Sequence, residues 1–284
     1  MKFSSQFRNF VLSWKSCFAS MRHAKIFLPF IIYAGLQIGF IVMLMFFAYP
    51  PFAAFFAPII MKLFGEPALH YPNNFLVLPS LFFWVNLLLS GLLGILLIGA
   101  TTRLFSSTYR AKSVSLGDGL RGTFPDYALL LLVWIVETAC LLAVFMGVPR
   151  LLGKIAFLAN RGALPIQLLT SLAAIVVGAL FVYTTALIVL EKAGPIRAIA
   201  RSLSLFAKYP VITILLIAIP NFIRMPIDLL SGKTQFLITK FNPEIVAGVL
   251  IMSVLLSIFT NYFLVGTVTG YFLMAKDKGM PISA

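Results

Sequence analysis

The residues of this sequence that bear most directly on chemistry are ionisable side chains inside long apolar stretches. Glu137 is the clearest case, because it lies between Val136 and Thr138 near the middle of one such stretch. Ionisable groups are costly inside a bilayer and by default indicate a functional site. One hypothesis is that Glu137 is a proton or substrate site. The hypothesis that we favour is that its protonated carboxyl hydrogen-bonds to a neighbouring helix, because such polar contacts between helices are common.

Arg224 and Asp228 form a second candidate, because a spacing of four residues places both side chains on one helix face. Pro220 and Pro226 lie on either side of Arg224 and interrupt the helical hydrogen bonds there. A broken helix beside a charged pair is typical of a transporter site. The alternative is a kinked helix end, from which the Arg224 side chain extends to the outer membrane interface.

Amide side chains accompany these charged residues in the apolar stretches. They belong to Asn86, Asn221 and Asn261. One hypothesis is that Glu137, Asn221 and Asn261 share a cavity at the membrane midplane. Small residues at a spacing of four, such as Gly266 and Gly270, instead predict close packing between helices.

The sequence contains none of the common catalytic or nucleotide-binding motifs. It has no glycine-rich phosphate loop and no HExxH, CxxC or GxSxG pattern. Its two cysteines, Cys17 and Cys140, lack a partner at metal-ligand spacing and imply no disulfide framework. We therefore expect no enzymatic activity, no metal and no cofactor. A lipid-modifying enzyme is the least favoured class, because no paired carboxylates or histidine cluster supply its chemistry.

The composition is that of a polytopic membrane protein. Of the 284 residues, 61% are hydrophobic and 11% are charged, and the mean hydropathy is +1.03. A soluble domain is nearer half apolar and a quarter charged. These values exclude a soluble enzyme, a disordered chain and a disulfide-stabilised scaffold. The net charge of +14 is explained by membrane topology, and we expect no nucleic-acid partner.

Six apolar stretches reach the roughly 20 residues that a helix needs to cross a bilayer. They cover residues 26–48, 79–102, 127–147, 167–190, 210–230 and 245–275. The predicted fold class is therefore all-α, with six transmembrane helices arranged as three hairpins. We expect a basic amphipathic helix at 1–25, a transmembrane domain at 26–275 and a tail at 276–284.

Lys and Arg are distributed unequally between the two sides of the predicted membrane. The N-terminal segment, the second-to-third and fourth-to-fifth connections and the tail together hold 15 of the 22 basic residues. Because positively charged loops stay in the cytoplasm, both termini are predicted to be cytoplasmic. We expect a bacterial cytoplasmic membrane. A mitochondrial presequence is the alternative for the basic leader, which lacks acidic residues.

Three basic segments on this predicted cytoplasmic side have the pattern of amphipathic helices. In the N-terminal segment, Arg8, Lys15 and Arg22 step by seven along the face opposite a stripe of aromatic residues. The connections contribute further bases: Arg121, Arg197, Arg201 and Lys208. Helices with one apolar and one basic face lie in the interface of anionic membranes. The expected partners are anionic lipids or a membrane protein, including a second copy of the chain.

One segment resembles the signature of a broad bacterial and archaeal family of six-span membrane proteins. The family includes YciC-like proteins and the membrane domain attached to some glycerophosphodiester phosphodiesterases. The segment covers residues 186–210, and its matching residues are Glu191, Gly194, Pro195, Ala198, Arg201 and Ser202. The resemblance implies six spans and no agreed catalytic chemistry. No phosphodiesterase domain is present in the sequence, so that activity is not implied.

Two functional hypotheses follow from these patterns. The first is a non-enzymatic integral membrane protein that engages anionic lipid or a membrane partner through its basic interfacial helices. The alternative is a small transporter or permease for a solute or a lipid. In that case Glu137 and the pair Arg224/Asp228 lie on the transport path.

Overall fold

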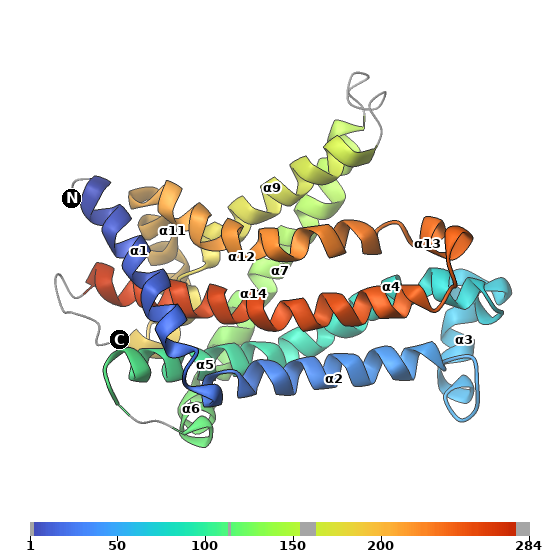
Figure 1. Cartoon of the computed structure of the whole chain (residues 1–284), viewed down its shortest axis with the longest axis horizontal. Coiled ribbons are helices and arrows are strands. Elements are labelled where there is room, and N and C mark those ends of the chain that lie inside the picture. The colour runs from blue at the N-terminus through green and yellow to red at the C-terminus, as the bar shows by residue number, and fades with distance from the viewer. Residues whose placement is uncertain (1–2, 113–114, 154–162, 277–284) are drawn as a thin grey trace. The chain divides into compact units, whose positions relative to one another are not determined.

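The computed structural model describes residues 3–112, 115–153 and 163–276. Throughout these ranges the regular secondary structure is helical, and no strand is present (Figure 1). Six helical segments within them are long and apolar enough to cross a membrane. The predicted all-α fold class with six transmembrane helices is therefore confirmed.

The six spans agree with the predicted stretches in number and position. The first is α2 (Leu28–Met45), and the second combines α4 (Asn73–Leu89), η3 (Ser90–Gly94) and α5 (Ile95–Tyr109). The third combines α6 (Leu116–Thr123), η4 (Phe124–Asp126) and α7 (Tyr127–Leu152). The others are α9 (Ala163–Phe181) with α10 (Thr184–Glu191), α12 (Pro210–Ser231) and α14 (Ile245–Lys276). The second and third are longer than predicted, because the basic connection between them is largely helical.

Shorter helices lie outside the long apolar stretches. They include α1 (Phe3–Ser20), α3 (Ala53–Phe64), α11 (Pro195–Lys208) and α13 (Thr234–Lys240). The helix expected at 1–25 corresponds to α1, and α11 begins with Pro195 in the first helical turn, where a proline is well tolerated. Apart from Lys276, the predicted tail at 276–284 lies outside the described residues.

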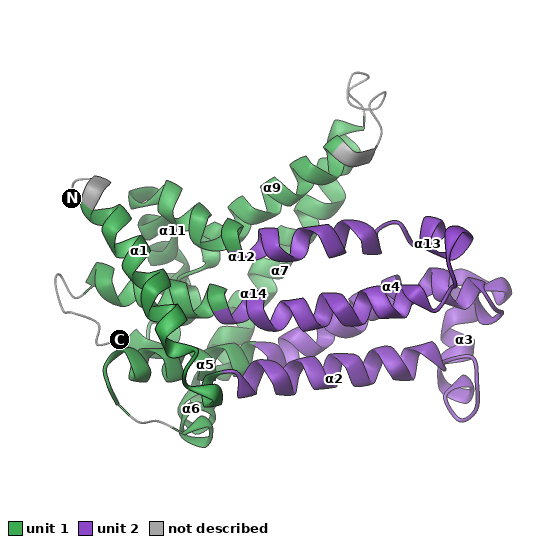
Figure 2. Cartoon of the chain, viewed as in Figure 1, with its two compact units in different colours: residues 1–26, 95–219, 263–284 green, residues 27–94, 220–262 purple. Residues whose placement is uncertain are grey.

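The contacts divide the chain into two compact units (Figure 2). Unit 1 comprises Met1–Ile26, Ile95–Ile219 and Phe263–Ala284, and unit 2 comprises Phe27–Gly94 and Pro220–Tyr262. Each unit is therefore assembled from separate stretches of sequence, and α12 and α14 contribute residues to both.

Unit 1 is built around a buried core from α5, α7, α10, α12 and α14, and α1 packs on it through small residues. Ser13 and Cys17 of α1 are fully buried. A Cβ atom added at Gly266 of α14 would lie 2.5 Å from Cys17 Sγ and 2.8 Å from the ring of Phe105. One at Gly270 would lie 3.5 Å from Ser13 Cβ. The close helix packing predicted from Gly266 and Gly270 is thus confirmed, and α1 is one of the helices involved.

Unit 2 packs α2, α4, α13 and part of α14 around a second buried core, against which residues of α12 lie partly buried. The ring of Phe27 stacks on that of Tyr262 with their centroids 4.1 Å apart. The π-helical turn at Ser90–Gly94 brings the chain close to Tyr33, whose ring lies 3.4 Å from a Cβ atom added at Gly94. This small residue therefore allows α2 to approach the second span closely.

Candidate functional site

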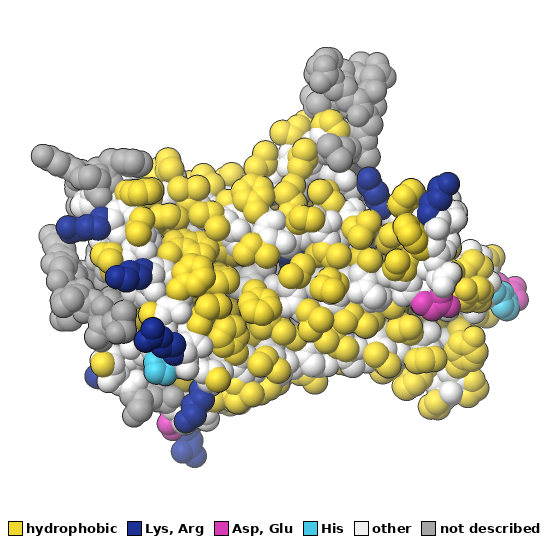
Figure 3. All heavy atoms as spheres, viewed as in Figure 1, with side chains coloured by type: hydrophobic (Ala, Val, Ile, Leu, Met, Phe, Trp, Pro, Cys, Tyr) yellow, Lys and Arg dark blue, Asp and Glu magenta, His cyan; other side chains and the backbone are white. Residues whose placement is uncertain are grey.

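The predicted bases in unit 1 are all exposed, and together they are called the basic surface here. They are Arg8 and Lys15 on α1, Arg22 in the turn after it, Arg121 on α6, and Arg197, Arg201 and Lys208 on α11. In the view of Figure 3, Lys and Arg side chains follow the course of α1, whereas hydrophobic side chains cover the flanks of the long helices. The structure therefore places all seven predicted bases on the outside of one unit.

The aromatic stripe predicted for α1 divides between two environments. Phe10 is buried in the core of unit 1, and Trp14 stacks on Phe263 with ring centroids 5.6 Å apart. By contrast, Phe7 and Phe18 remain 47% and 53% exposed. Sequence periodicity did not separate these roles, because it identifies an apolar face without showing which part contacts protein. The exposed part is suited to contact lipid.

Cys17 illustrates how firmly the other face of α1 is packed. Its side chain is fully buried. Burial raises the pKa of its thiol to about 12, although a hydrogen bond with Tyr109 acts in the opposite direction. Because the thiolate is the reactive form of cysteine, Cys17 is expected to be inert as long as α1 stays docked.

On α11 the fully buried side chains are small, whereas its larger apolar side chains, such as Ile199 and Leu205, pack against the core only partly buried. Ala198 and Ser202 are fully buried. The Ser202 hydroxyl donates to the Leu180 carbonyl at 2.6 Å and accepts from the Tyr183 amide at 3.4 Å. Leu180 and Tyr183 border the break between α9 and α10, where backbone groups lose helical partners. Ser202 therefore fastens α11 to that break.

The packing of α11 leaves large apolar side chains uncovered beside its bases. Ile196 is 83% exposed, and Leu203 is 40% exposed. Phe124, at the end of α6, is 69% exposed. Exposed apolar residues next to exposed bases are typical of a helix at a membrane interface.

Two acidic residues hold the helix ends of unit 1 together. Glu191, at the end of α10, accepts hydrogen bonds from Arg201 of α11 and, at 3.1 Å, from Lys276 of α14. Arg201 was predicted to face lipid, but its charge is partly compensated by Glu191. The ion pair of Glu191 with Arg201 joins two of the residues that carry the family resemblance of segment 186–210. Between them, Gly194 and Pro195 form the start of α11.

The second acidic residue, Asp126, was not singled out in the sequence. Its buried carboxylate accepts from Lys192 Nζ at 2.5 Å and from Arg103 Nη2 at 3.2 Å. Arg103 also donates to the Val189 carbonyl at 3.2 Å. A Cβ atom at Gly122 would lie 3.1 Å from Arg103 Nη1, so the glycine makes room for the guanidinium. An acid at the start of an apolar stretch was the available signal, but its partners are distant in sequence.

The remaining bases are not neutralised by acids in this way. Within the described ranges, Arg8, Lys15, Arg22 and Arg197 form no ion pair. Lys208 Nζ lies 5.3 Å above the ring of Tyr209, and this cation–π contact compensates part of its charge without an acid. The basic surface therefore carries an excess of positive charge that is available to an external anion.

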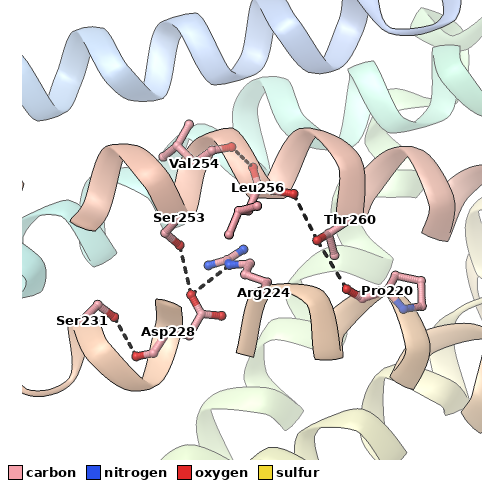
Figure 4. Close-up of polar contacts among 9 residues, drawn as sticks. Pro220, Arg224, Asp228, Ser231, Ser253, Val254, Leu256 and Thr260 are labelled. Atoms are coloured by element: carbon pink, nitrogen blue, oxygen red, sulfur yellow. Dashed lines mark hydrogen bonds and ion pairs between the residues drawn. The ribbon is translucent and has the colours of Figure 1, made fainter. Parts of the chain in front are cut away.

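The second candidate site is the charged pair of α12, which lies wholly in unit 2 (Figure 4). Arg224 Nε donates to Asp228 Oδ1 at 3.0 Å, as the spacing of four residues predicts. Ser253 Oγ of α14 donates to the same oxygen, also at 3.0 Å. The Arg224 and Asp228 side chains are 38% and 45% exposed. The pair is therefore held by a second helix but remains accessible.

Asn86 belongs to another polar contact inside unit 2. Its Oδ1 accepts from Gln37 Nε2 at 2.5 Å and from the Tyr33 hydroxyl at 3.2 Å, which ties α4 to α2. Gln37 is only 5% exposed, and its Oε1 has no hydrogen-bond partner among the described residues. The amide predicted from sequence is thus part of a polar network between α2 and α4.

The other predicted intramembrane residues are not brought together by any described contact. Glu137 lies partly exposed on α7 of unit 1 and makes no hydrogen bond or ion pair with a described residue. Asn221 and Asn261 belong to unit 2. The cavity hypothesised for these three residues stays a prediction. No cluster of three His, Cys, Asp or Glu side chains occurs in the part of the chain that the structure describes.

The chain was also compared with protein-family models, with curated proteins and with solved structures. None of the three comparisons found a match. The resemblance to the YciC-like family therefore stays a prediction that rests on residues 186–210.

Proposed function

We propose that this integral membrane protein is non-enzymatic and binds anionic lipid headgroups at the basic surface of unit 1. The observation that carries the proposal is the pairing of exposed bases with exposed apolar side chains on the same short helices. On α1, Lys15 lies beside Phe18, and on α11, Arg197 lies beside Ile196. Such helices place their apolar side chains among acyl chains and their bases among headgroup phosphates.

The number of uncompensated bases sets the scale of the attraction. Each base near an anionic membrane surface contributes about 1 kcal/mol. Arg8, Lys15, Arg22 and Arg197, which have no acidic partner in the described ranges, thus contribute about 4 kcal/mol. That free energy corresponds to a preference for anionic over neutral lipid of roughly a thousandfold.

The proposal places the basic surface at the cytoplasmic leaflet of a bacterial membrane. The support is the excess of Lys and Arg in the segments that precede, connect or follow the spans on that side. The ion pairs of Glu191 and Asp126 then act as positioning contacts. The pairs of Glu191 join α10 to α11 and α14, so that α11 is presented to the membrane in one orientation. Those of Asp126 join the start of α7 to Arg103 of α5 and to Lys192 at the end of α10.

A double charge reversal tests this function. Lys15→Glu with Arg197→Glu changes two uncompensated bases and leaves the pairs of Glu191 and Asp126 intact. Lys62→Glu with Lys233→Glu, both in unit 2, is the matched control. The purified proteins, in neutral detergent micelles, are titrated with phosphatidylglycerol or phosphatidylcholine, and bound lipids are counted by native mass spectrometry.

The double reversal is expected to bind at least tenfold less phosphatidylglycerol, whereas the control binds as much as the wild type. Binding should also weaken with salt, because the Debye length falls from about 10 Å at 0.1 M to about 3 Å at 1 M. Equal retention by all three proteins would refute the proposal, and the surface would then be better assigned to a protein partner. Monodisperse elution of each variant verifies folding.

The contact of Ser253 with Asp228 favours a second candidate function, a small transporter or permease. Polar groups from α12 and α14 meet there, and Pro220 and Pro226 lie within α12 beside them. The helix break predicted at these prolines is absent, because α12 runs without interruption from Pro210 to Ser231. In this alternative, Glu137 and the pair Arg224/Asp228 line the path. Flux in proteoliposomes is the test: Glu137→Gln and Arg224→Gln should each abolish pH-dependent uptake. Wild-type liposomes that transport nothing above empty ones, over a broad solute panel, would exclude this candidate.

A further inference from the structure

The charged pair of α12 lies in the last two turns of that helix, which ends at Ser231. Asp228 is bonded to Ser253, about 12 Å along α14 from its start at Ile245. On the other side of Arg224, the Pro220 carbonyl accepts from Thr260 at 3.4 Å, about 22 Å along the same helix. Arg224 therefore lies between these two levels. Both residues belong to a segment that is long and apolar enough to span a membrane.

Both members of the pair have unused hydrogen-bonding capacity. Only the Nε atom of Arg224 is engaged, and its two terminal nitrogens make no hydrogen bond with a described residue. Only Oδ1 of Asp228 is engaged, by Arg224 and by Ser253. The exposed fractions of 38% and 45% leave the free atoms accessible. A guanidinium and a carboxylate that face hydrocarbon are costly, so these atoms need polar partners.

A second polar group in the same unit also lacks a partner. Gln37 Oε1 is buried without a hydrogen bond, one turn along α2 from Tyr33. Tyr33 and Gln37 both bond to Asn86, which joins α2 to α4 in the same unit. A buried amide oxygen with no donor is rare in folded proteins and indicates a bound water or ligand. An acceptor is therefore left open on α2, in addition to donors and an acceptor on α12.

We propose that Arg224 and Asp228 form a binding site for a zwitterionic group, in which an ammonium lies close to an oxyanion. The guanidinium is matched to a carboxylate or phosphate oxygen, which it binds through two nitrogens. The free carboxylate oxygen of Asp228 is matched to an ammonium. Because the two side chains lie at i and i+4, their charged ends face a ligand whose opposite charges are only a few atoms apart. A purely anionic or purely cationic group would leave one charge of the pair uncompensated.

This inference deepens the second candidate function and rests on the same pair, but it concerns binding and does not require flux. Two sources present this chemistry: the headgroup of phosphatidylethanolamine and a free amino acid such as alanine. Phosphatidylethanolamine retention is measured by native mass spectrometry from neutral detergent micelles. Radiolabelled alanine binding is measured by scintillation proximity in nanodiscs of phosphatidylglycerol, which contains no zwitterion.

The variants are Arg224→Gln and Asp228→Asn, with Lys233→Gln as a control that removes a base from the same unit. We expect one of the two probes to bind the wild type, and each site variant to bind it at least tenfold more weakly than the control. Where a site variant does not elute as a monodisperse species, Ser253→Ala replaces it. That variant removes the hydrogen bond that positions the Asp228 carboxylate and should weaken binding about threefold.

Each result separates the alternatives. Binding of phosphatidylethanolamine alone assigns the site to a lipid headgroup, and binding of alanine alone assigns it to a free solute. If neither probe binds, or if folded site variants bind as well as the control, the proposal is overturned. Absence of flux with intact, variant-sensitive binding would exclude the transporter while leaving this site in place. The phosphatidylglycerol binding of the basic-surface variants tests the first proposed function and does not depend on the results for zwitterion binding or for flux.

Discussion

Gly266→Ala is expected to loosen α1 from unit 1 and to expose Cys17. The added Cβ atom would lie 2.5 Å from Cys17 Sγ and 2.8 Å from the Phe105 ring, well inside normal contact distance. Overpacking of this kind costs 1–3 kcal/mol, and two such contacts place this site near ~3 kcal/mol. Replacing glycine by alanine in a helix returns ~1 kcal/mol. The net loss of about 2 kcal/mol raises the fraction of undocked α1 roughly 30-fold.

Gly248→Ala provides the matched control, because a Cβ atom at that position of α14 meets nothing within 4 Å. The assay is the rate of maleimide labelling of Cys17 in a Cys140→Ala background, in neutral detergent micelles. Labelling requires α1 to undock, since Cys17 is fully buried. Gly266→Ala should therefore label roughly 30-fold faster than the wild type, and Gly248→Ala at the wild-type rate. Equal rates for the two glycine variants would refute the close packing of α1 on α14.

Three further predictions concern unit 1. Asp126→Asn leaves Arg103 and Lys192 without their carboxylate, so it should lower the free energy of unfolding by about 3 kcal/mol. Lys192→Gln changes an exposed side chain and should lower it by less than about 1 kcal/mol. If the two variants lose equal free energy of unfolding in mixed micelles, Asp126 is not the residue on which these ion pairs depend. Ser202→Ala removes the hydrogen bonds to the α9–α10 break and should lower the free energy of unfolding by about 1–3 kcal/mol in the same assay. A decrease below ~0.5 kcal/mol would show that these hydrogen bonds contribute little. Ile196 is 83% exposed on α11. The fluorescence of Ile196→Trp, in a background without other tryptophans, should therefore be quenched by brominated phosphatidylglycerol in nanodiscs. Unquenched fluorescence would mean that this side chain does not contact lipid.

The arrangement of charge in unit 1 has a consequence for the proposed lipid binding. Asp126 and Glu191 are nearly buried and pair with bases of other helices, of which Lys192, Arg201 and Lys276 stay about half exposed. The bases of α1 and Arg197 lack such partners in the described ranges and remain exposed. The acids therefore stabilise the fold without cancelling the charge that an anionic membrane would meet.

Properties that depend on nearby residues were predictable from sequence. The six spans follow from hydropathy over about 20 residues, and the helical form follows because a bilayer offers no other partners for the backbone. The ion pair of Arg224 with Asp228 was predicted from its spacing alone, since i and i+4 are neighbours on any helix. The N-terminal helix was predicted from its periodicity in the same way.

Properties that depend on helix packing were decided only by the tertiary structure. Asp126 meets Lys192 from 66 residues away, and Asp228 meets Ser253 from 25 residues away. No periodicity encodes such pairs, because they arise where small residues let particular helices approach. The same packing selects the fully buried face of α11, which is formed by the small residues Ala198 and Ser202 and not by large apolar residues such as Ile196 and Leu203. The sequence by itself thus determined which segments enter the membrane and where charge accumulates, and the packing of those segments decided which charges are paired and which stay open to a ligand.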